Sequence, residues 1–142
     1  MKRIHYFLLT LVCLFTSSMA MADDVPIPVE KLPTEAKTFI KAHFADKSVL
    51  LATKDWDSYE CHLDDGTKID FNKKGVWQKV DCLMNAVPAA LVPAQIAKYV
   101  TATFPNCTII KIEKERYGWD IELSNDMELK FNKQGVLIGM DD

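Results

Sequence analysis

The sequence predicts an α+β fold made of two copies of a helix-plus-four-strand unit, with both helices on one face of an antiparallel sheet and the other face open. Three observations predict this fold. Residues 27–82 align without a gap on residues 87–142, which indicates an internal repeat. Each copy starts with apolar residues at the spacing of one helical face. Each copy then continues with segments that alternate apolar and polar residues, as strands with one covered face do.

Identical residues recur at an offset of 60 positions throughout the repeat. The densest match is the segment 71–76 (FNKKGV), which recurs as 131–136 (FNKQGV). A single unit of about 55 residues would have a marginal hydrophobic core, and stacking two units supplies the missing burial. We therefore expect residues 23–142 to form a single domain that contains both repeats.

Residues 1–22 are predicted to be a cleaved secretory signal peptide. Lys2 and Arg3 precede an apolar run over about residues 6–15, and Ala20-x-Ala22 offers the small residues that a signal peptidase requires. The mature chain would then begin at Asp23.

Two alternatives would keep the chain at a membrane. An uncleaved anchor would need roughly 20 consecutive apolar residues to span a bilayer, and the run at the N-terminus is about half as long. A lipoprotein would use Cys13, but Val12 stands where a small Gly or Ala is expected. The sequence therefore favours a periplasmic or secreted protein with no stable membrane insertion after cleavage.

Each unit is expected to begin with one amphipathic helix. Pro33 and Pro93 suit the first helical turn, where no amide donor is lost. The apolar residues of the two helical faces are Leu32, Ala36, Phe39, Ile40 and Phe44 in the first unit, and Val92, Ile96, Tyr99, Val100 and Phe104 in the second.

The strands of each unit are expected to form a meander. The first strands are predicted near residues 49–53 and 108–113, and the next segments, 59–63 and 119–123, alternate strictly. A two-residue turn at Asp65-Gly66 would mix the two faces, whereas a three-residue loop over 64–66 keeps apolar residues opposite one another. This loop places Cys61 opposite Ile69 and Tyr59 opposite Phe71, and in the copy it pairs Leu123 with Met127, Ile121 with Leu129 and Trp119 with Phe131.

The last strand of each unit gives conflicting signals. The turns at residues 72–75 and 132–135 carry a glycine in the left-handed position. Simple alternation points Val76, Val80, Val136, Ile138 and Met140 inward, which leaves Trp77 and Leu137 outward. A glycine bulge would shift the register and turn Trp77 inward instead. We expect Trp77 to face outward and keep the bulge as the alternative.

The mature chain retains three cysteines, Cys61, Cys82 and Cys107. An odd number allows at most one internal pair. Because Cys61 is predicted to face the core, Cys82 and Cys107 are the candidate disulfide. The cysteine spacing excludes a thioredoxin-like Cys-x-x-Cys site.

Composition and motifs favour a binding protein over an enzyme. The chain has 17 Lys and Arg against 20 Asp and Glu, and loss of Lys2 and Arg3 with the signal peptide makes the balance more acidic, which argues against a nucleic-acid partner. The mature chain has two histidines, His43 and His62, and neither follows a metal-ligand or catalytic-triad pattern. The aspartates of residues 55–70 miss the spacing of a calcium loop. We therefore predict no enzymatic activity, no metal and no cofactor.

The export segment, the twofold unit, the Pro-x-x-x-x-Pro lead into each helix and the Phe-Asn-Lys-x-Gly turn resemble the PepSY-like, β-lactamase-inhibitor-like domains of secreted proteins from Bacteroides-type bacteria. The resemblance covers about residues 25–142. It implies a tandem repeat that presents a concave sheet to an enzyme, and a role in restraining proteases as in PepSY domains. Inhibition of a β-lactamase itself would be an analogy at the level of the fold.

The open sheet face is the predicted interaction surface. Its candidate residues are Trp77, Glu60, His62, Asp70, Lys79, Asp120, Glu122, Lys130 and Leu137. A Trp among charges can anchor a protein interface, so the leading hypothesis is a secreted binding module that docks an envelope protein or peptide, with inhibition of an enzyme as its specific form. The alternative is a small-molecule or glycan binder that uses Trp77 or Trp56 as a stacking platform.

Overall fold

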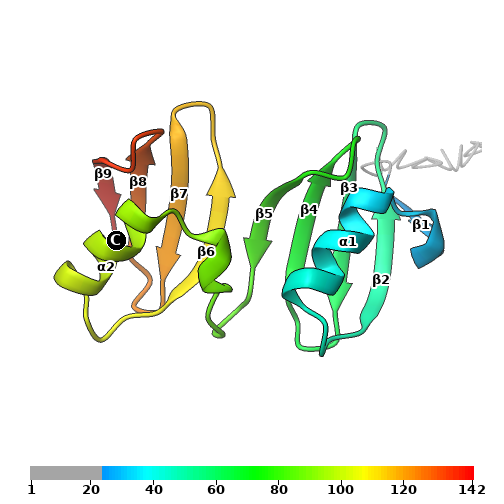
Figure 1. Cartoon of the computed structure of the whole chain (residues 1–142), viewed down its shortest axis with the longest axis horizontal. Helices are drawn as coiled ribbons and strands as arrows, with labels where there is room; N and C mark the ends of the chain where they lie inside the picture. The colour runs from blue at the N-terminus through cyan, green and yellow to red at the C-terminus, as the bar shows by residue number, and fades with distance from the viewer. Residues whose placement is uncertain (1–23) are drawn as a thin grey trace, which may run out of the picture.

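One antiparallel sheet of nine strands carries the α-helices α1 and α2 of the described residues on the same face (Figure 1). This computed structural model describes residues 24–142, so the predicted signal peptide over residues 1–22 lies outside the described residues. The strands lie side by side in the order of the chain, from β1 at one edge to β9 at the other. The α+β fold predicted from the repeat is confirmed.

The elements of the two units correspond at an offset of 60 residues. The first unit contains η1 (Val29–Lys31), α1 (Thr34–His43), β2 (Val49–Lys54), β3 (Ser58–Leu63), β4 (Lys68–Asn72) and β5 (Trp77–Asp81). The second contains η2 (Ala89–Leu91), α2 (Ala94–Thr103), β6 (Ile109–Lys114), β7 (Gly118–Leu123), β8 (Glu128–Asn132) and β9 (Leu137–Asp141). A short strand that the sequence did not predict, β1 (Val25–Ile27), precedes them.

Strands β5 and β6 join the two units into one sheet. Val80 of β5 lies opposite Ile112 of β6. In the first unit, Ile27 of β1 lies opposite Ala52 of β2, the position that corresponds to Ile112. Strand β5 therefore pairs with the first long strand of the second unit in the same way that β1 pairs with the first long strand of the first unit.

The core lies between the sheet and the helices. A row of cross-strand neighbours runs across the whole sheet on this side, and its inner members are buried. They are Ala52, Cys61, Ile69, Val80, Ile112, Ile121 and Leu129. Ala36 and Ile96, which are fully buried, face this row from the two helices. The predicted apolar helical faces are thus the faces that pack on the sheet.

The predicted three-residue hairpin loops are confirmed. Tyr59 lies opposite Phe71 and Cys61 opposite Ile69. The amide of Leu63 donates to the carbonyl of Thr67 at 2.8 Å, which closes the loop over residues 64–66. The copy closes in the same way, from Leu123 to the Met127 carbonyl at 2.9 Å.

The predicted outward orientation of Trp77 is wrong, and the bulge that was the alternative is present. The register shifts between Asp70 and Phe71, so that Trp77 lies opposite the buried Phe71. In the turn, the Asn72 side chain accepts hydrogen bonds from the amides of Lys74 and Val76, and the Asn72 amide donates to the Val76 carbonyl, so that Trp77 follows opposite Phe71. The additional residue is Gln78, between Trp77 and Lys79, and it lets Trp77 and the buried Val80 both face the helix side, which simple alternation does not allow.

An equivalent bulge in the second unit places Leu137 opposite Phe131 on the helix side. Leu137 is therefore not on the open face, contrary to the prediction. Val76, Val136 and Ile138, which were expected to point inward, are exposed.

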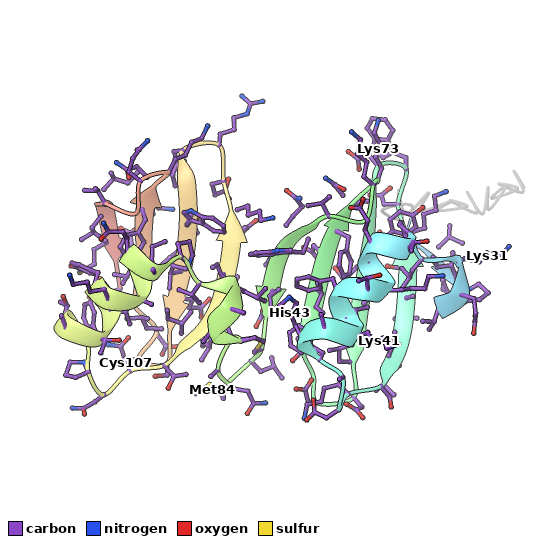
Figure 2. All side chains as sticks on the ribbon, in the orientation of Figure 1. Lys31, Lys41, His43, Lys73, Met84 and Cys107 are labelled. Atoms are coloured by element: carbon purple, nitrogen blue, oxygen red, sulfur yellow. The ribbon has the colours of Figure 1, made fainter. Side chains whose placement is uncertain are left out.

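The three cysteines of residues 24–142 are free thiols in this structure, so the predicted disulfide between Cys82 and Cys107 is not formed. Cys82 follows β5 and is buried in the hydrophobic core, whereas Cys107 is half-buried in the loop that follows α2 (Figure 2). Cys61 is fully buried, as its place in the alternation predicted.

Candidate functional site

The face of the sheet away from the helices carries two continuous rows of polar side chains that cross both units. In each row, every residue lies opposite the next one on the neighbouring strand. The first row is Thr53, Glu60, Asp70, Lys79, Glu113, Asp120 and Lys130. The second row is His62, Lys68, Asp81, Lys111, Glu122, Glu128 and Asp141. We call these two rows the open face.

The structure places most of the predicted interaction residues on the open face. Those that lie there are Glu60, His62, Asp70, Lys79, Asp120, Glu122 and Lys130. The two predicted residues that do not are Trp77 and Leu137, which the bulges turn toward the helices.

The open face is acidic. Its two rows contain eight carboxylates and four lysines. Like charges lie opposite each other in the pairs Glu60–Asp70, Glu113–Asp120 and Glu122–Glu128. Like-charged cross-strand pairs are destabilising, so the sheet carries this arrangement at a cost to its own stability.

Lysines partly neutralise the carboxylates of the second unit. The Lys130 Nζ lies 3.4 Å from Asp120 Oδ2 and 3.6 Å from Glu128 Oε1. The Lys111 Nζ lies 3.4 Å from Glu122 Oε2. These side chains are partly exposed, so each pair contributes little to stability and remains available to a charged partner.

Tyr117 extends the network around Asp120. Its hydroxyl donates a hydrogen bond to Asp120 Oδ1, and the Lys130 Nζ lies 3.4 Å from the Tyr117 oxygen. The hydrogen bond with Tyr117 and the charge of Asp120 raise the pKa of Lys130 above its ordinary value. Lys130 is therefore a permanent cation on this face.

The carboxylates of the first unit are less fully neutralised by lysines. Asp70 lies between Glu60 and Lys79 in its row. Burial, followed by repulsion from Glu60, raises the pKa of Asp70 to about 6. The ring of His62 is hydrogen-bonded to Glu60 through Nε2. A positively charged partner group at this point would remove the repulsion between the two carboxylates.

One group of acidic side chains could offer ligand atoms to a cation. Oxygen atoms of Glu113, Glu115 and Asp120 lie within 4.8 Å of one another. The ammonium of Lys130, 3.4 Å from Asp120, already supplies a positive charge there. Sequence spacing did not reveal this group, because Asp120 reaches the other two only through the pairing of β6 with β7.

Trp77 lies at the junction of the two units, on the helix side of the sheet. Its indole stacks on Phe39 of α1, with ring centroids 5.9 Å apart, and lies 6.1 Å from the ring of Trp119. The Nζ of Lys114 lies 4.1 Å from the centre of the Trp77 ring, a cation–π contact. Trp77 is thus occupied by contacts within the protein and does not form a stacking platform.

The two histidines of residues 24–142 lie on opposite sides of the sheet. His43 is near the end of α1 (Figure 2), with its ring 4.8 Å from that of Phe39. His62 lies on the open face. They cannot take part in one site.

A family model described as "Putative beta-lactamase-inhibitor-like, PepSY-like" matches residues 19–64 and 57–139. The chain belongs to this PepSY-like family. No curated protein matches it.

Three solved structures of similar proteins come from Bacteroides. One, described as a "putative calcium-regulated periplasmic protein" from Bacteroides thetaiotaomicron, is 44% identical, with a TM-score of 0.81 over 84% of this chain and 98% of that one. Another, a "putative periplasmic protein from DUF2874 family" from Bacteroides vulgatus, is 43% identical, with a TM-score of 0.80 over 86% and 99%.

A further Bacteroides vulgatus structure, a "putative periplasmic protein of unknown function", is 34% identical, with a TM-score of 0.79 over 84% and 99%. All three relatives are described as periplasmic, in agreement with the location predicted for this PepSY-like protein. Within residues 24–142, the structure has no helix that is long and apolar enough to cross a membrane.

Proposed function

We propose that this PepSY-like protein is a non-enzymatic binding module of the periplasm whose open face docks a basic surface of a protein partner. The observation that carries this proposal is the continuity of the two polar rows across both units. Because β5 pairs with β6, the carboxylates of the two repeats form one surface rather than two.

Charge determines the kind of partner. The open face has twice as many carboxylates as lysines, and several carboxylates face each other without a lysine between them. A partner with clustered Lys and Arg would relieve these repulsions on binding, and complementary charges also speed association. The family description is inhibitor-like, so an enzyme with a basic rim around its active site is the specific partner class that we infer.

Affinity capture with matched variants tests this proposal. Glu122→Lys combined with Glu128→Lys reverses two adjacent charges of the open face. Glu35→Lys reverses an exposed charge on α1 and serves as the control. Capture from a periplasmic extract, identified by mass spectrometry, should give a partner that the wild type and Glu35→Lys retain and the double variant loses. Equal retention by all three proteins would contradict the proposal.

Two further arms of the same capture distinguish other modes of binding. Because one relative is described as calcium-regulated, the capture is run both with calcium chloride and with EDTA. In the alternative of glycan binding, the aromatic platform would be Trp56, which is 84% exposed. A glycan-array signal lost in Trp56→Ala, with no protein captured, would favour that alternative over protein docking.

A further inference from the structure

Strand β9 forms one edge of the sheet, and its outer side is unpaired in the described structure (Figure 1). Two of its apolar residues, Ile138 and Met140, are exposed. An edge strand with exposed apolar residues presents its free N–H and C=O groups to any further strand. The edge adjoins the open face that carries the proposed function, and Asp141 is the one residue that belongs to both.

The first unit shows how such an edge is completed. Strand β5 corresponds to β9 and pairs along this same side with β6. In β5, Val80 lies opposite Ile112 and is fully buried. Met140 holds the equivalent position in β9, has no neighbour on that side and is 42% exposed. The β5–β6 pair therefore serves as an internal template for the neighbouring strand that β9 lacks on its outer side.

On the helix side of the sheet, a side chain from the neighbouring strand covers the last strand of the first unit, whereas the last strand of the second unit is left uncovered. Pairing with β6 brings Lys114 to within 4.1 Å of the centre of the Trp77 ring. Leu137 is the counterpart of Trp77, and it lines an open depression between α2 and β9 together with Tyr99 and Val136. The depression lies where a side chain equivalent to Lys114 would be placed.

The charges at the end of β9 define the occupant further. Asp81 of β5 lies opposite Lys111 of β6. Asp141 holds the place of Asp81, and Asp142 follows it. An added strand would therefore be favoured by a basic residue opposite Asp141 and an apolar residue opposite Met140.

We propose that the edge of β9, with the depression beside α2, binds an extended segment of a partner protein that adds to the sheet as an antiparallel strand. The segment would carry the pattern of residues 111–114: a basic residue, an apolar residue, any residue, and a long basic residue that reaches over Leu137. Backbone hydrogen bonds would supply the affinity, and the alternate side chains the specificity. In a second copy, β6 already pairs with β5 and β7, and its equivalent β2 pairs with β1 and β3, so neither strand that carries this pattern is free to add, and we assign the occupant to a different protein.

The test uses a synthetic peptide of residues 108–115 and the mature protein labelled for NMR. Saturable shift changes are expected for the amides of residues 137–141 and for Tyr99 in α2. Shift changes that map to open-face residues outside β9 or to the β1–β2 edge, or a peptide that does not saturate, would overturn the proposal. A dimer detected by sedimentation, with its two copies paired through their β9 edges, would also overturn it.

Methylated peptides supply a matched control that does not depend on the folding of a variant. The amide of Cys82 donates to the carbonyl of Ile110 across the β5–β6 pair. Because bonds to one neighbour fall on alternate residues of a strand, Ile112 and Val80 also bond to each other, whereas Glu113 bonds away from β5. N-methylation at Ile112 should weaken binding about tenfold or more, and N-methylation at Glu113 should leave it nearly unchanged. Equal affinities of the two peptides would contradict strand addition.

Charge reversal tests the register. Asp141→Lys should weaken the peptide severalfold, and changing Lys111→Glu in the peptide should restore part of the loss. The open-face variant Glu122→Lys should bind the peptide like the wild type. Loss of peptide binding in Glu122→Lys would place the peptide on the open face, whereas failure of partner capture in that variant concerns only the proposed function.

Discussion

The ring of Trp77, in the last strand of the first unit, lies 6.1 Å from the ring of Trp119, in the second unit. The same indole stacks on Phe39 of α1. Trp77 therefore joins the helix of one repeat to the sheet of the other. This contact lies directly behind the β5–β6 pair that makes the open face continuous.

Trp77→Ala is expected to lower the free energy of unfolding by about 2–4 kcal/mol, because it removes aromatic packing from the junction. Trp56→Ala is the matched control, since Trp56 is exposed, and it should change stability by less than about 0.5 kcal/mol. Urea unfolding followed by circular dichroism measures both. Similar effects of the two substitutions would contradict the inward orientation of Trp77.

Thiol reactivity tests the state of the cysteines. Burial raises the pKa of Cys61 to about 12 and also raises the pKa of Cys82, and a thiol reacts through its thiolate. In the folded mature protein, iodoacetamide should therefore label Cys107 first. All three cysteines should react after denaturation without a reductant. Labelling of Cys61 alone in the denatured protein would reveal a disulfide between Cys82 and Cys107.

The raised pKa of Asp70 predicts a pH dependence of stability. The folded protein holds this proton up to about pH 6, whereas the unfolded chain releases it near the ordinary value of 3.8. Stability should therefore fall as pH rises from about 4 to about 6 and then stay level. Asp70→Asn should remove this fall and stabilise the protein at neutral pH by about 1 kcal/mol, a value reduced for solvent screening.

Thermal unfolding across this pH range measures the effect, with Asp57→Asn, at an exposed loop position, as the control. An Asp70→Asn curve parallel to that of the wild type would show that burial and Glu60 do not shift the titration of Asp70.

Gly118, the first residue of β7, is required by the backbone. Its φ is +150°, and a Cβ there would lie 2.2 Å from the carbonyl oxygen of Phe131. Gly118→Ala should cost at least about 2 kcal/mol. Gly139→Ala is the control, because a Cβ at that position makes only ordinary contacts with Lys130. Equal stability of the two variants in chemical unfolding would contradict this account of β7.

The repeat and its alternation predicted most of the fold, because each depends on local spacing. The offset of 60 residues, the helical faces and the hairpin pairs such as Cys61–Ile69 all follow from short-range patterns. The orientation of Trp77 did not, because it depends on the pairing of Trp77 with Phe71 and on the additional residue Gln78 in β5, which alternation does not encode. Strand β1 was missed because three residues that include Pro26 give almost no periodic signal.

Most of the residues predicted for the open face lie there, but the sequence did not predict a continuous surface. Alternation placed Glu60 and Asp120 outward, and the structure agrees. Pairing of Lys79 with Glu113 joins strands on either side of α2, so it depends on a long-range contact that the sequence pattern does not specify. The acidic group that includes Glu115 arises from the same kind of cross-strand proximity.

Hydrogen–deuterium exchange of the complex with the captured partner shows whether the binding surface spans both repeats. Open-face docking predicts that the partner slows exchange in β3, β4, β7 and β8 together, and that it protects neither α1 nor α2. Protection confined to the helices, or to the strands of one unit alone, would contradict a binding surface that spans both repeats.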